Sequence, residues 1–91
     1  MAVQLVTYDL RKPDRDYGEL FTAIKALGVW CHCVESVWLV RTDLTSGQVR
    51  NHLRSHIGSN DLLFVTSLAG NWATCNLSEK HLNWLHSNLA A

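Results

Sequence analysis

The stretch that decides the fold is residues 17–42, YGELFTAIKALGVWCHCVESVWLVRT. Its first part repeats apolar side chains at the spacing of one helix face, namely Tyr17, Leu20, Phe21, Ile24 and Leu27. Asp16, with Glu19 three residues later, suits the N-terminal cap of this helix. The second part, residues 29–34 and 36–42, is rich in β-forming residues around a polar interruption, which predicts a β-hairpin.

The same two patterns recur on both sides of this stretch. Residues 3–10, VQLVTYDL, and residues 62–68, LLFVTSL, predict two further strands. Thr45 and Gln48 match a capping box, which predicts that a helix begins there, and Ser78 suits the N-cap of a last helix. The predicted inner faces of these two helices are Val49, Leu53 and Ile57, and then Leu82, Leu85 and Leu89.

The elements follow in the order βαββαβ, with one more helix at the end. This order predicts an α+β protein with a ferredoxin-like core, in which an antiparallel four-stranded sheet carries two helices on one face and the first strand lies between the third and the fourth. We expect one domain over residues 1–91, with a core at 3–69 and a C-terminal extension at 70–91. The residues expected near the core are Val3, Leu5, Phe21, Ile24, Leu53 and Ile57.

Both faces of the predicted sheet are apolar, although two helices cover only one face. In the third strand Val37 and Leu39 point to one side and Trp38 and Val40 to the other. The last helix or a second copy of the chain must therefore cover the second face. We expect a homodimer, because a monomer rarely leaves a large apolar patch open. The residues expected at the dimer interface are Trp30, Trp38 and Phe64.

The composition narrows the classes of partner. Lys and Arg total 8 and Asp and Glu total 8, so no global basic field attracts nucleic acid, and binding would need a local patch. No stretch approaches the roughly 20 apolar residues of a membrane span, and the N-terminus lacks a signal-peptide pattern. We therefore expect a cytoplasmic protein with no membrane partner. The 3 cysteines are expected to be reduced, without a structural disulfide.

Three short motifs in this order suggest a family. Residues 7–10, TYDL, end the first strand, residues 36–40, SVWLV, belong to the third, and Asp61 opens the fourth. Over residues 3–69 the chain resembles the small dimeric CRISPR-associated proteins that partner the spacer integrase, and it is similar at the same places to the VapD-type toxin ribonucleases. It departs from that family after Leu68, where family members usually have a further strand that pairs with the other protomer.

The resemblance implies a ferredoxin-like homodimer that binds or cleaves RNA or DNA. In this family the acid at the end of the first strand, here Asp9, approaches its mate across the two-fold axis. The resemblance therefore implies that Asp9 is a catalytic residue and a ligand of Mg²⁺ or Mn²⁺ in a metal-dependent endonuclease. Two alternatives stay open: Asp9 caps the turn after its strand, or the dimer is a catalytically inert scaffold or interaction protein.

The loop after the first strand carries a cluster of basic residues, Arg11, Lys12 and Arg15. Such side chains can contact the phosphates of a nucleic acid, although a solvated loop is the alternative interpretation. Arg50 and Arg54 lie one helical turn apart and form a second basic patch, which is more often an ordinary hydrophilic surface.

Two further groups contain metal-ligating residue types. His52 and His56 have the spacing with which two imidazoles reach one metal, but they lack the acid of the H-E-x-x-H pattern, which favours a helix-surface pair. On a strand, Cys31 and Cys33 share one face and His32 points to the other, which favours buried thiols over a metal site. No glycine-rich phosphate loop or Gly-x-Ser-x-Gly elbow occurs in the sequence, and the enzyme classes that need them are excluded.

Overall fold

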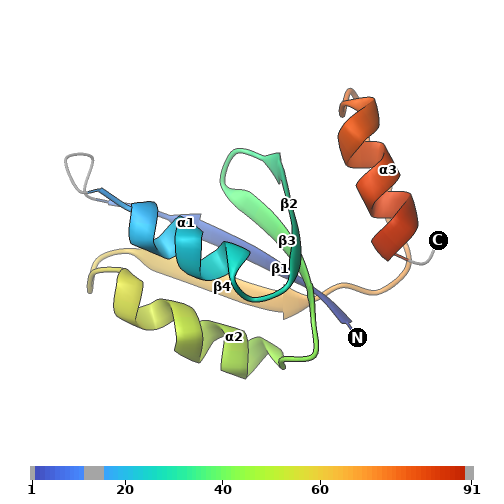
Figure 1. The fold of residues 1–91 in the computed structure, drawn as a ribbon. Helices are drawn as coiled ribbons and strands as arrows, with labels where there is room; N and C mark the ends of the chain where they lie inside the picture. Colours follow the sequence, from blue (N-terminus) through green and yellow to red (C-terminus); the bar gives the residue numbers. More distant parts are fainter. Residues whose placement is uncertain (1, 12–15, 90–91) are drawn as a thin grey trace.

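The computed structural model of the chain describes residues 2–11 and 16–89 (Figure 1). These residues form an α+β structure with a four-stranded antiparallel sheet and three α-helices, which confirms the predicted class. The strands are β1 (Ala2–Asp9), β2 (Val29–Val34), β3 (Val37–Thr42) and β4 (Leu62–Ser67). The helices are α1 (Gly18–Lys25), α2 (Ser46–Leu53), followed by the short 3₁₀ helix η1 (Arg54–His56), and α3 (Glu79–Asn88).

The sheet has the order β2-β3-β1-β4, so β1 lies between β3 and β4, as predicted. β1 pairs antiparallel with both neighbours, and Val6 lies between Trp38 of β3 and Val65 of β4. β2 and β3 form the predicted hairpin, with its turn at residues 35–36. The pairing of this hairpin is irregular between Cys31 and Val34.

α1 and α2 cover one face of the sheet (Figure 1). α2 begins with the predicted capping box, because the Gln48 backbone N–H donates to the Thr45 side chain and the Thr45 backbone N–H donates to the Gln48 side chain. The N-cap of α1 is Tyr17 and not the predicted Asp16, which precedes it and accepts a hydrogen bond from the Gly18 N–H at Oδ1. The buried cluster on this face consists of Val6, Tyr17, Leu20, Ile24, Trp38, Val40, Val49 and Leu53, with Phe21 and Ile57 packed against it.

α3 covers part of the opposite face and lies beyond the β2 edge of the sheet in Figure 1. It begins at the predicted N-cap, where the Ser78 hydroxyl accepts a hydrogen bond from the His81 backbone N–H. The buried cluster beneath it consists of Val3, Cys31, Leu39, Leu85 and Leu89. The last helix is therefore one of the elements that cover the second apolar face.

The predicted core divides between the two faces. Val3 and Leu5, which we expected near the core together with residues of the first two helices, pack on the α3 side. The reason is the two-residue period of β1, which turns Gln4 toward α2 instead. Gln4 is 1% exposed there, and its amide is satisfied because it donates to Ser67 Oγ and accepts from Ser46 Oγ.

The β4 end of the second face is open. Leu62 is 53% exposed and Phe64 is 61% exposed, and neither belongs to the cluster under α3. We call the surface formed by Asp9, Leu62 and Phe64 the open strip. None of the helices in the described part of the chain has the length and apolar character needed to cross a membrane.

Candidate functional site

Asp9, the predicted catalytic and metal-binding residue, is the last residue of β1 and pairs with Leu62 of β4. Its side chain is 58% exposed, and Arg11 holds it, with Nε at 3.0 Å and Nη2 at 2.8 Å from the same carboxylate oxygen, Oδ2. An exposed ion pair of this kind contributes only about 0–1 kcal/mol, so Arg11 can be displaced. A cation would therefore compete with Arg11 for Asp9.

Of the predicted basic cluster, the structure describes Arg11. The Arg11 guanidinium is exposed and lies against Asp9, whereas Lys12 and Arg15 lie outside the described residues. A shallow hollow of about 230 Å³ adjoins this strand end. Its lining consists of Thr7, Tyr8, Asp9, Leu62, Leu63 and Phe64. The described part of the site therefore combines one acid, one base and exposed apolar side chains.

A second carboxylate, Asp61, is buried near the same end of the sheet, with 8% exposure. It accepts hydrogen bonds from the backbone N–H groups of Arg11 at 2.7 Å and Gly58 at 2.8 Å, and from the Tyr17 hydroxyl at 2.8–2.9 Å. These bonds join the end of β1, the start of α1 and the turn before β4. The sequence indicated Asp61 as the residue that opens the fourth strand, because nothing local to it indicates Tyr17 as its partner.

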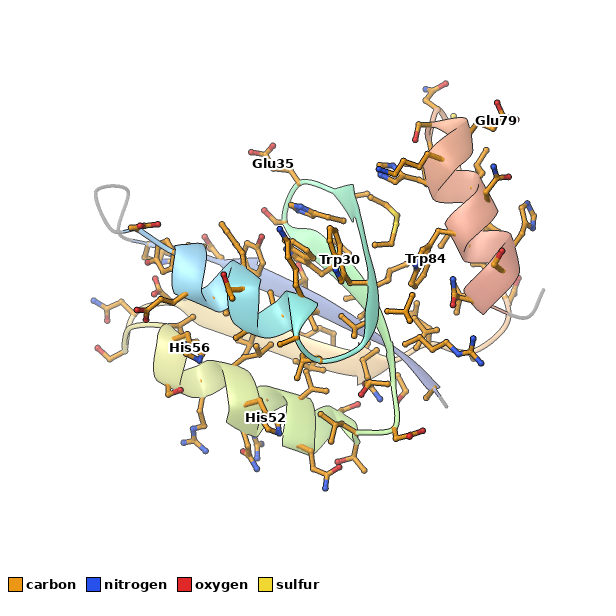
Figure 2. All side chains as sticks on the ribbon, viewed as in Figure 1. Trp30, Glu35, His52, His56, Glu79 and Trp84 are labelled. Carbon is orange, nitrogen blue, oxygen red and sulfur yellow. A yellow bond between two sulfur atoms is a disulfide. The ribbon has the colours of Figure 1, made fainter. Side chains whose placement is uncertain are left out.

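The predicted interface residues do not form one surface. Trp38 is 2% exposed and lies in the cluster under α1 and α2, so its predicted place on an open apolar patch is wrong. Trp30 is 40% exposed but lies on the α1 side, where Lys25 Nζ is 5.0 Å from its ring (Figure 2). Phe64 is exposed on the opposite face. The alternation of side chains along β2, β3 and β4 separates these residues.

Tyr8 lines the hollow beside Asp9 and also contacts Trp38, which is buried under α1 and α2. Its hydroxyl accepts a hydrogen bond of 3.0 Å from Trp38 Nε1. Burial raises the pKa of Tyr8 above its ordinary value of 10.0; the hydrogen bond from Trp38 opposes this rise and the charge of Glu35 adds to it. Tyr8 is therefore a neutral phenol at pH 7 and does not act as a base.

Cys31 and Cys33 form a disulfide, so the expectation of reduced thiols is wrong for this pair. They share one face of β2, as predicted, with Cα atoms 5.7 Å apart, a separation that a disulfide spans readily. Figure 2 shows this bond, in yellow, between β2 and α3. The two sulfurs and a ring nitrogen of His81 all lie within 4.8 Å of one another. Cys75 is a free, exposed thiol.

The predicted histidine pair, His52 and His56, lies at a different hollow from His81. His52 and His56 line a hollow of about 620 Å³ beside α1 and the residues that follow β3. His56 Nδ1 lies 3.9 Å from Glu19 Oε2. Among the described residues, the group with metal-ligand spacing is the Cys31, Cys33 and His81 group, and His52 does not belong to it. The surroundings of His52 and His56 therefore agree with the alternative interpretation, an ordinary pair on the helix surface.

No protein-family model matches the chain, and no solved structure matches it significantly.

Proposed function

We propose that the chain is a ferredoxin-like protein that works as a homodimer and binds the phosphate backbone of a nucleic acid, as the resemblance to the CRISPR-associated integrase partners implies. The strand order with β1 in the centre supports the ferredoxin-like assignment. The observation that carries the proposal is the open strip, where exposed apolar side chains lie beside an exposed acid and an exposed arginine.

A two-fold axis at the open strip would bury the exposed apolar side chains and would bring the polar residues of two chains together. A second copy would cover Leu62 and Phe64, which α3 leaves exposed. It would also bring two copies of the Asp9–Arg11 ion pair toward one another, and the N–H donors that each Arg11 keeps beyond its two bonds to Asp9 would form a phosphate-binding patch on a chain whose formal net charge is zero. Lys12 and Arg15 follow in the same loop and would add to that patch.

Metal-dependent cleavage is the second candidate function. Two Asp9 carboxylates across the axis would supply the hard oxygen ligands that Mg²⁺ or Mn²⁺ prefers. Arg11 already neutralises Asp9, and this favours a binding protein without cleavage activity over an endonuclease. A dimeric scaffold for another protein is the alternative that remains if nucleic acid does not bind.

The dimer is tested by light scattering on purified protein at micromolar concentration. We expect twice the chain mass of 10.3 kDa, a shift toward the monomer for Phe64→Ser, and no shift for the control Trp30→Ser on the other face. A folded wild-type protein with the monomer mass would refute the dimer.

Binding is tested by anisotropy of labelled RNA, single-stranded DNA and duplex DNA over a range of salt concentrations. Arg11→Ala is expected to weaken binding and to reduce the salt slope by about 0.7–0.9 for each lost phosphate contact. The matched control is Arg50→Ala on α2, which should leave both unchanged. If Arg50→Ala has the larger effect, the second basic patch binds the nucleic acid, and if no nucleic acid binds at low salt, the proposal is wrong.

Cleavage is tested on the same substrates with Mg²⁺ and with Mn²⁺. The binding proposal predicts intact substrates for the wild type. Metal-dependent cleavage that Asp9→Asn abolishes and Asp43→Asn, a change at another exposed acid, preserves would establish the second candidate.

A further inference from the structure

β2 and α3 bring together three residues with side chains that commonly bind metal ions. Cys31 and Cys33 point to the same face of β2, because side chains two residues apart share a face of a strand. His81 lies in the first turn of α3, whose backbone is held there by the Ser78 cap. The three ligand atoms lie within 4.8 Å of one another. The fold, rather than the spacing in the sequence, assembles this group.

The distances suit zinc. A tetrahedral Zn²⁺ holds thiolate sulfur at about 2.3 Å and imidazole nitrogen at about 2.0 Å, which places its ligand atoms roughly 3.5–3.8 Å apart. The separations within this group require only a small adjustment once the sulfur–sulfur bond is open. Thiolate and imidazole are also the ligands that select zinc over Mg²⁺ or Ca²⁺.

The surroundings leave room for an ion. Cys31 is 4% exposed, and Cys33 and His81 are half-buried. The group borders a hollow of about 450 Å³ between β2 and α3. The lining consists of Trp30, Cys31, His32, Lys80, His81 and Trp84. Figure 2 shows Trp84 pointing from α3 toward the sheet. Three protein ligands at the wall of such a hollow leave the fourth coordination position to water or to another small ligand.

We propose that the reduced chain binds one Zn²⁺ through Cys31, Cys33 and His81, and that the Cys31–Cys33 disulfide is the oxidised, metal-free state of this site. A dithiol reductant supplies two electrons and two protons and becomes a disulfide itself, while Cys31 and Cys33 become two thiols. Zinc then binds both sulfurs as thiolates, and two protons leave for solvent. Oxidation removes both sulfur ligands at once.

The ion would join the two elements that form the second face of the molecule. Two of its ligands belong to β2 and the third belongs to α3, which otherwise packs through Leu85 and Leu89. Zinc would therefore stabilise the docking of α3 on the sheet. The thermal stability of the reduced protein should rise with zinc, because a ligand that binds only the folded state stabilises it by mass action.

Metal binding is tested on the full chain, reduced under anaerobic conditions, with Zn²⁺ and with Co²⁺ as its coloured substitute. We expect one metal per chain, a thiolate-to-cobalt charge-transfer band and a higher melting temperature, and none of these for the disulfide form. Cys33→Ser and His81→Ala should each weaken binding by more than the roughly 10–100-fold loss that removal of an outer-sphere partner causes. The controls Cys75→Ser and His52→Ala should bind zinc like the wild type.

Alkylation of the wild-type protein gives a second readout that does not depend on the folding of a variant. Zinc should protect the two thiols of β2 from iodoacetamide, while the exposed Cys75 reacts with or without zinc. Equal zinc binding by the reduced and oxidised proteins, loss of binding in either control, or alkylation of Cys33 that zinc does not slow would overturn the proposal. The proposal would also be wrong if Cys31 and Cys33 exchange their disulfide with a dithiol but the reduced chain binds no zinc.

Discussion

The two faces of the sheet are built differently. Under α1 and α2 the centre of the core is closed to solvent, with 0% exposure for Val6, Leu20, Ile24 and Val40. On the other face one helix of 10 residues covers the β2 side, while Phe64 on β4 remains 61% exposed. The indole N–H groups of Trp72 and Trp84 on this second side are buried, with no hydrogen-bond partner among the described residues.

This difference separates the closed part of the core from the two candidate sites. The α1 and α2 face satisfies its buried polar groups and, apart from Trp30, buries its large apolar side chains, so it stabilises the chain without help from a partner. The α3 face holds both candidate sites, namely the open strip and the group of Cys31, Cys33 and His81 beneath α3. A face that is incompletely packed is where a partner or an ion has most to contribute.

The largest loss of stability is expected when a buried leucine side chain is removed, and each face of the sheet offers one such leucine. Leu53→Ala should lower the free energy of unfolding by about 2–5 kcal/mol, because it leaves a cavity where 0% of the side chain is exposed. Leu85→Ala should cost less, at the lower end of this range, because α3 can separate locally while the rest stays folded. Urea denaturation measures both changes. Equal losses would mean that both faces belong to one cooperative core.

The second prediction tests the buried carboxylate under α1. Asp61→Asn should cost on the order of 3 kcal/mol, because an amide group cannot accept all the hydrogen bonds that the Tyr17 hydroxyl and two backbone N–H groups donate. Tyr17→Phe removes one donor and should cost about 1.5 kcal/mol. Urea denaturation of both variants gives the ranking, and the reverse order would show that the Tyr17 hydroxyl contributes more to stability than the charge of Asp61.

The third prediction concerns the hairpin that both faces share. At Gly28 a Cβ would collide with the backbone carbonyl oxygen of Arg41, so Gly28→Ala should destabilise the protein by about 1–3 kcal/mol through a shift of β2. The control is Gly47→Ala in α2, where nothing lies within 4 Å of the added Cβ. That change should raise stability by about 0.5–1 kcal/mol, since alanine favours a helix. Thermal melts give both signs, and a neutral Gly28→Ala would mean that β2 adapts freely.

The smallest effect concerns Tyr8 and depends on pH. Tyr8→Phe should cost about 1 kcal/mol at neutral pH, because Trp38 Nε1 loses its acceptor. The pKa of Tyr8 is raised in the folded state, so its contribution is fully present below the ordinary pKa of 10.0 and is lost as pH rises through the folded pKa. The stability difference between wild type and Tyr8→Phe should therefore narrow above pH 10. Denaturation at neutral and alkaline pH measures it, and a constant difference would contradict the pKa shift.

Local patterns in the sequence predict the helices, the strands and their order along the chain. The helical period from Tyr17 to Leu27, the Thr45 capping box and the Ser78 cap are local patterns, and they predicted where helices lie because capping and periodicity act within a few residues. The strand order followed from element order, since connections between adjacent elements leave few arrangements.

Which side chains meet depends on how the elements pack together in three dimensions. The alternation along β1 and β3 was visible in the sequence, but which side would carry α1 and α2 was not, so Trp38 was assigned to a surface and is buried. Asp61 and Tyr17, and likewise Cys33 and His81, are partners from distant segments. No local pattern encodes such pairs, because their contact depends on how α1 and α3 pack against the sheet.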